Sequence, residues 1–119
     1  MNKIEEVSKV KNFSYEIALQ ESIKYFNGDE LAANVFLNKY ALRDNEQNLM
    51  EKTPEDMHKR IAKEFARIEK NKFKKPLSYE EIFYLLDKFK FIIPQGSPMY
   101  GIGNNYQYGI LMDNTTLIG

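Results

Sequence analysis

The stretch that decides the fold is "TPEDMHKRIAKEFARIEK", which runs from Thr53 to Lys70. A threonine oxygen can accept a free backbone amide, and proline at the first helical position gives up no hydrogen bond. Two carboxylates follow at the positive end of the helix dipole. Apolar residues then recur at helical spacing, at Met57, Ile61, Phe65 and Ile68. The pattern predicts an amphipathic helix from Pro54 to about Lys70.

Similar signals extend in both directions from this helix. Ser14 and Asp29 are candidate N-caps, and Ser78 with Glu81 stands in the positions of a capping box. The sequence therefore predicts a mainly α fold of about four helices, with residues 1–90 as a helical N-terminal domain and 91–119 as a short strand and glycine-rich loop segment. We expect the core to contain Leu31, Val35, Phe36, Ile61, Phe65, Ile82, Leu85 and Phe89.

Composition narrows the function classes. The 119 residues carry 43% hydrophobic and 29% charged residues, the balance of a soluble globular domain, and the start lacks the apolar core of a signal peptide. We therefore expect a cytoplasmic protein. Seventeen basic and seventeen acidic residues give no net field, so neither a nucleic acid nor a membrane is an expected partner. The chain has no cysteine, which excludes disulfides, cysteine-ligated metals and thiol catalysis within it.

A glycine-rich stretch, "FIIPQGSPMYGIGNN", spans residues 91–105. Gly96 and Gly101 have the spacing of a P-loop, but Ile102 and Gly103 follow where that motif needs lysine and Ser/Thr. The sequence Gly-Ile-Gly also opens a dinucleotide pattern, but Tyr106 occupies its third glycine position. A plain surface loop and part of a phosphate site both remain open.

Other residues that could carry a metal site, acid–base catalysis or nucleic-acid binding give weaker signals. The lone His58 has no second histidine nearby, so we expect a solvated or capping side chain and no metal site. The acidic pairs 55–56 and 80–81 lie in the first turns of helices, where the dipole explains them. The basic stretch 70–75 contains Phe73 and could bind single-stranded nucleic acid, but we expect it to be a solvated connection between helices.

Three blocks in order carry a resemblance to a known family. They are "DELAANVFLNKYALRD", "EKTPEDMHKRIAKEFARIE" and "LSYEEIFYLLDKFKFIIPQGSPMYGIGNN", which together span residues 29–105. This order resembles the N-terminal helical region of the large, catalytic subunit of ribonucleotide reductases, which leads into the first strand of the reductase barrel. The resemblance implies a role in making deoxyribonucleotides for DNA synthesis.

The resemblance also implies site residues. Gly96 and Ser97 are similar to the family's substrate phosphate loop, and Asn114 is similar to the residue before a redox cysteine and is grouped with that loop. Thr115 stands where the cysteine is expected, and a threonine hydroxyl cannot form a disulfide. The resemblance therefore implies a chain with no catalytic residue and no bound cofactor of its own, inactive alone, while the radical cofactor of the intact enzyme stays open.

Three functional hypotheses follow. We favour a truncated or separately encoded piece of a reductase large subunit, whose partner is the chain with the rest of the barrel or a second copy of itself, and which binds nucleotide weakly if at all. The second hypothesis is a repurposed helical protein-interaction module without a nucleotide role. The third is an unrelated small helical binding protein.

Overall fold

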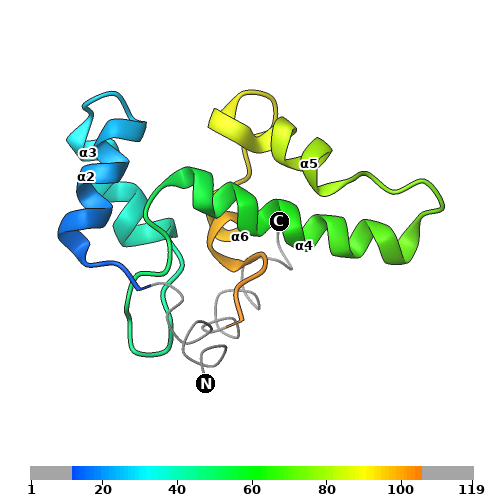
Figure 1. The fold of residues 1–119 in the computed structure, drawn as a ribbon, viewed down its shortest axis with the longest axis horizontal. Coiled ribbons are helices and arrows are strands. Elements are labelled where there is room, and N and C mark those ends of the chain that lie inside the picture. The colour runs from blue at the N-terminus through cyan, green and yellow to red at the C-terminus, as the bar shows by residue number, and fades with distance from the viewer. Residues whose placement is uncertain (1–11, 106–119) are drawn as a thin grey trace, which may run out of the picture. The chain divides into compact units, whose positions relative to one another are not determined.

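A computed structural model describes residues 12–105 of the chain, and all structural statements below concern these residues. The chain divides between Pro54 and Glu55 into two compact units, and each is described by itself. Helices account for most of the described residues, and no strand longer than an isolated bridge occurs among them (Figure 1). The predicted mainly α fold class is confirmed.

The first unit begins with two helices whose caps were predicted. Helix α2, Tyr15–Tyr25, starts after Ser14, whose hydroxyl accepts a hydrogen bond from the Ile17 amide at 3.2 Å. Helix α3, Glu30–Val35, starts after Asp29, whose carboxylate accepts from the Ala32 amide at 3.0 Å. Each cap satisfies a first-turn amide that has no partner inside its own helix.

Helix α3 continues directly into a turn of π-helix, η1, Phe36–Tyr40. The Ala41 amide donates to the Phe36 carbonyl at 3.0 Å, which closes the wider turn. An extra residue per turn rotates the side chains that follow out of the α-helical register. Phe36 and Leu37, the first two residues of the turn, are buried with Ala33, at the i, i+3 and i+4 positions of one helix face.

The expected core is confirmed in part and corrected in part. Phe36, Ile61 and Ile82 are buried as expected. Leu31, by contrast, is 74% exposed, and Val35 and Phe65 are also exposed. On α3 the buried face is that of Ala33, Phe36 and Leu37, so Leu31 and Val35 lie on the other side of the helix. The buried apolar residues of the first unit are Ala18, Ala33, Phe36, Leu37, Ala41 and Leu49.

The connection from residue 41 to residue 53 is held by polar contacts. The Phe13 and Arg43 backbones each form an isolated antiparallel bridge with Leu49. The Glu51 carboxylate accepts from the Leu42 amide at 2.9 Å. The buried Ser22 hydroxyl donates to the Lys52 carbonyl at 2.6 Å, which ties this connection to α2.

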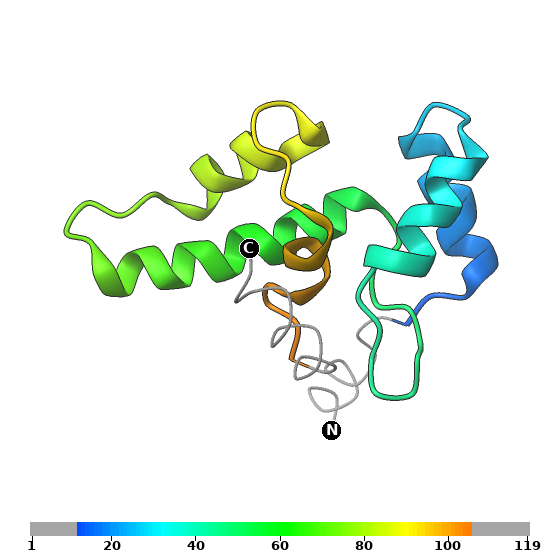
Figure 2. The same ribbon diagram turned by 180° about the vertical axis from the view of Figure 1, so that it is seen from behind.

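The second unit is dominated by α4, Pro54–Lys72, the helix predicted from the opening stretch. Helix α5, Tyr79–Leu86, has the predicted capping box, because the Ser78 hydroxyl accepts from the Glu81 amide while the Glu81 carboxylate accepts from the Ser78 amide. In Figures 1 and 2, α5 runs alongside α4 and a long connection joins the two helices.

A short 3-10 turn, η2, Asp87–Phe89, ends α5. Lys88 and Phe89 both adopt positive φ angles, 58° and 56°, and the Ile92 amide donates back to the Leu85 carbonyl. A short strand was expected in 91–119, but residues 91–105 contain none, and residues 91–93 are exposed. The domain boundary after Lys90 stays a prediction.

The glycine-rich stretch that follows also differs from expectation. Residues 96–101 form a short helix, α6, Gly96–Gly101, rather than an open loop. Pro98 at the third position suits this geometry, because the first turn of a helix needs no amide from it. The second unit buries Met57, His58, Ile61, Ala62, Ile82 and Leu86.

Candidate functional site

Helix α6 contains the serine that is expected to contact phosphate. Gly96 and Ser97 are its first two residues, and the Met99 amide makes a helical hydrogen bond to the Gln95 carbonyl at 3.0 Å. The amides of the two residues that precede Pro98 lie ahead of the helix's own hydrogen-bond ladder. The Ser97 side chain, half-buried, therefore lies in the same turn as two amides that point away from the helix.

The other end of α6 is held by an arginine from α4. Arg60 donates to the Met99 carbonyl at 2.7 Å and to the Ile102 carbonyl at 2.5 Å, with a longer contact of 3.4 Å to the Tyr100 carbonyl. The last carbonyls of a helix have no partner within it and carry partial negative charge, so a guanidinium is a favourable partner for them. Arg60 thereby fixes the C-terminal end of α6 to α4.

A glycine permits this close approach. Gly103 has φ +76°, and a Cβ atom placed on it would lie 3.0 Å from the Arg60 Cγ and 3.3 Å from the Arg60 carbonyl oxygen. Asn104, which is 5% exposed, donates from its side-chain amide to the Tyr100 carbonyl at 3.2 Å. The backbone after α6 is therefore seated directly against α4.

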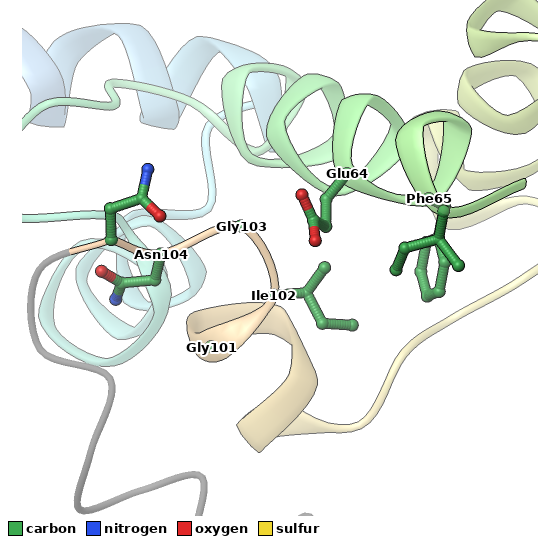
Figure 3. A pocket seen from close by; sticks show the side chains of 8 residues that line it. Glu64, Phe65, Gly101, Ile102, Gly103 and Asn104 are labelled. Atoms are coloured by element: carbon green, nitrogen blue, oxygen red, sulfur yellow. The ribbon is translucent and has the colours of Figure 1, made fainter. Parts of the chain in front are cut away.

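A groove of about 590 Å³ lies beside this contact. In Figure 3, Glu64 and Phe65 project from α4 toward Ile102 on the segment after α6. Ile68 and the residues of 101–105 complete the lining. The groove is thus mainly apolar, with amide groups at one end.

The carboxylate in the groove is already engaged. Arg67 donates from Nε to Glu64 Oε1 at 3.0 Å and from Nη2 to Glu64 Oε2 at 2.6 Å. These hydrogen bonds hold the pKa of Glu64 below its ordinary value. Within residues 12–105 no cluster of three metal-ligating side chains occurs.

The structure corrects the expectation for His58. Its side chain is fully buried rather than solvated, and its ring meets Phe89 edge-on with 4.6 Å between ring centroids. Neither ring nitrogen has a hydrogen-bond partner among the described residues. Burial lowers the pKa of His58 to about 4, although the nearby Asp87 carboxylate opposes that change. His58 follows the buried Met57 on α4, and Phe89 of the η2 turn covers its ring.

The family model described as "Ribonucleotide reductase, all-alpha domain" matches residues 26–101. The chain belongs to this family. The match confirms the resemblance to the N-terminal region of the ribonucleotide reductase large subunit. No curated protein and no solved structure matched the chain.

The ribonucleotide reductase all-alpha domain covers α3 to α6 of this chain. It contains Arg60 and two of its acceptors, Met99 and Tyr100, whereas Ile102 and Gly103 lie just beyond the matched residues. The contacts of Arg60 and Gly103 that hold the end of α6 against α4 form a clamp on α6. This clamp therefore extends past Gly101, the last matched residue.

The predicted site residues fall into two groups. Gly96 and Ser97 lie together in the first turn of α6. Asn114 and Thr115 lie outside the described residues, so their roles stay predictions. Sequence reasoning missed Arg60 and Gly103. An arginine on an amphipathic helix is usually interpreted as an exposed surface cation. Its contact with Ile102 joins residues 42 positions apart, so no local sequence pattern indicates it.

No helix between residues 12 and 105 is long and apolar enough to cross a lipid bilayer. Glu55 and Asp56 lie in the first turn of α4 as predicted, and Glu55 also forms an ion pair with Lys59 at 3.2 Å.

Proposed function

We propose that this ribonucleotide reductase all-alpha domain serves deoxyribonucleotide synthesis as the helical N-terminal region of a large subunit. It provides a packing surface and one part of a substrate site, and its partner is a chain that carries the barrel. The observation that carries the proposal is the family match over residues 26–101.

The chain is proposed to be inactive by itself. Reduction of a ribonucleotide needs a cysteine radical to abstract a ribose hydrogen and thiols to deliver electrons, and none of the 119 residues is cysteine. The thiols must therefore come from outside these residues. A separately encoded or truncated piece that works with a barrel chain is consistent with this requirement.

Within that role, the first turn of α6 is the proposed contact to the substrate's phosphates. Gly96 and Ser97 offer two amides and a hydroxyl at a helix N-terminus, the end of a helix dipole that favours anions. Arg60 anchors the opposite end of this helix and so fixes the direction in which the turn faces. Asn114 belongs to the same proposed site by resemblance alone.

A complementation assay tests the catalytic part of the proposal. The chain alone, with nucleoside di- or triphosphate, a reductant and either radical source, should form no deoxynucleotide. Its mixture with a barrel-bearing reductase chain that lacks this region should restore turnover. Turnover by the chain alone would contradict the proposal.

Nucleotide titration tests the phosphate contact. We expect affinity no better than about millimolar for the chain alone, because association costs several kcal/mol before any gain appears. In the mixture, Ser97→Ala should weaken nucleoside diphosphate binding by roughly 1.5–3 kcal/mol, the cost of one hydrogen bond to a charged group.

Ser14→Ala is the matched control. It removes a serine hydroxyl that caps α2 and costs about 1 kcal/mol of stability, but it should leave nucleotide affinity unchanged. If the mixture binds nucleotide tightly and Ser97→Ala has no effect, the turn is not a phosphate contact. If no barrel chain associates at all, a repurposed interaction module becomes the better description.

A further inference from the structure

The zero net charge of the chain conceals a strongly basic segment. Residues 59–79 contain eight lysine and arginine residues against two glutamates. This segment covers the second half of α4, the connection and the start of α5. A partner near it therefore meets a local positive field, even though the whole chain has none.

The structure turns part of this segment into a groove. Lys63, Arg67 and Lys70 line one wall on α4, and residues 76–79 line the other, around a volume of about 520 Å³. The spacing of three and four residues places the three cations on one helix face, over roughly 10 Å of helix length. Lys72 at the end of α4 and the lysines at 74 and 75 on the connection are also exposed and continue the positive tract.

The carboxylates close to the groove are already used. Glu64 is held by Arg67 at 2.6 Å. Glu69 accepts a hydrogen bond from the Leu77 amide at 3.0 Å, and Glu81 accepts from the Ser78 amide at 2.8 Å in the capping box. Glu69 thus ties α4 to the connection, Glu64 and Glu81 are held within their own helices, and Lys63 and Lys70 are exposed.

Aromatic rings accompany these cations. Phe73 is 57% exposed in the middle of the basic connection. Tyr79 lines the groove and stacks on Phe83 with 6.1 Å between ring centroids and 18° between planes. Cations that follow a backbone, together with rings on which bases stack, are the elements of a surface for single-stranded nucleic acid.

We propose that the groove between α4 and α5, with the connection that joins them, binds single-stranded nucleic acid through its phosphates and bases. An inorganic polyphosphate or an acidic peptide would use the lysines but would leave the exposed phenylalanine ring without a role. The function is separate from the reductase role proposed above. The proposal differs from the expectation, drawn from the zero net charge, that no nucleic acid is a partner. Binding depends on the charge close to the surface rather than on the charge of the whole chain.

The test is binding of a fluorescent 12-nucleotide single strand to the full chain, followed by anisotropy at several salt concentrations. The proposal expects micromolar binding at low salt that weakens as salt rises. The triple variant Lys63→Gln, Lys70→Gln, Lys74→Gln should lower the slope of log affinity against log salt by about 2, because each lost phosphate contact removes about 0.7 for a single strand.

A charge-matched control removes three lysines elsewhere. Lys24→Gln, Lys39→Gln, Lys90→Gln changes the net charge equally at exposed positions and should leave most of the affinity and the slope in place. Phe73→Ala should weaken binding about tenfold, and Phe73→Leu, which keeps the apolar side chain but removes the ring, should weaken it similarly. Far-UV circular dichroism verifies that each variant keeps its helices.

Three results would overturn the proposal. The first is equal loss of affinity in the groove variant and in the charge-matched control, which would indicate a diffuse charge effect. The second is unchanged binding in both Phe73 variants, which would assign the surface to phosphate alone. The third is competition by a poly-glutamate peptide at lower concentration than the oligonucleotide, which would identify a docking site for an acidic protein segment.

Discussion

Protonation of His58 should make the protein markedly less stable in acid. The imidazole is fully buried, and its pKa falls from an ordinary value of 6.5 to about 4 in the folded chain. Above pH 6.5 the ring is neutral in both the folded and the unfolded chain, so this contribution to stability is fully present. Between pH 6.5 and pH 4 the unfolded chain binds the proton more tightly, so the free energy of unfolding falls as the pH falls.

The size of this loss of stability follows from the lowered pKa of His58. A change of roughly 2.5 pKa units at about 1.36 kcal/mol per unit amounts to about 3 kcal/mol between pH 7 and pH 4. That is a large fraction of the stability of a small domain. The sequence contains a single histidine, so the imidazole signal in an NMR titration belongs to it without ambiguity.

The assay is urea unfolding followed by circular dichroism, at pH values from 7.5 to 4.5, for the natural chain and for His58→Leu. Carboxylates that titrate in this range contribute to both proteins, so the difference between the two isolates the histidine. His58→Leu should gain stability relative to the natural chain as the pH falls, by about 2–3 kcal/mol over the range. A third protein, Asp87→Asn, lacks the carboxylate that favours the charged ring and should show a lower imidazole pKa.

A stability difference that stays constant from pH 7.5 to pH 4.5 would refute this reasoning. So would an imidazole pKa at or above 6.5 in the folded chain. Either result would mean that the ring is solvated or has a hydrogen-bond acceptor that holds its proton.

Three further substitutions test the contacts in the second unit. Arg60→Met should lower the free energy of unfolding by roughly 2–4 kcal/mol and speed amide exchange after α6, because it removes charged hydrogen bonds to the carbonyls of Met99 and Ile102. Arg60→Lys should recover only part of that stability. Gly103→Ala should destabilise the protein by more than Gly28→Ala in urea unfolding. Both glycines have positive φ, but only at Gly103 would the added Cβ meet another atom, at 3.0 Å; equal costs would show that this close approach is unimportant. Ser78→Ala should cost about 1 kcal/mol through loss of the capping box, and unchanged exchange rates in α5 would argue against that cap.

The helices could be predicted from sequence because their signals are local. The caps at Ser14, Asp29 and Ser78 and the start at Pro54 depend on residues within four positions of one another, and each appears in the structure. Local hydrogen bonding decides these boundaries, so no knowledge of distant contacts is needed.

The core was harder to predict because burial depends on packing. Around α3 the buried face is that of Ala33, Phe36 and Leu37, and the spacing of apolar residues does not decide between it and the face of Leu31 and Val35. His58 shows the same limit for a polar side chain, since only the turn at residues 87–89 decides whether it meets solvent or Phe89.

For the candidate site, the sequence identified the segment but not its support. Ser97 was found through the family's order of motifs, while its setting in a helical turn was not expected. Arg60 could not be assigned a role, because its acceptors are backbone carbonyls, and a carbonyl has no identity in the sequence.

The clamp on α6 also has a consequence for producing the domain in the laboratory. A clone trimmed to the matched residues would end at Gly101 and would lack both the carbonyl of Ile102, which accepts the 2.5 Å hydrogen bond from Arg60, and the glycine that lets the backbone approach. Its last helix would keep the Met99 acceptor but would carry a new terminal carboxylate beside the guanidinium. Expression of this domain, or its transplantation into another reductase, should therefore extend at least to Asn104.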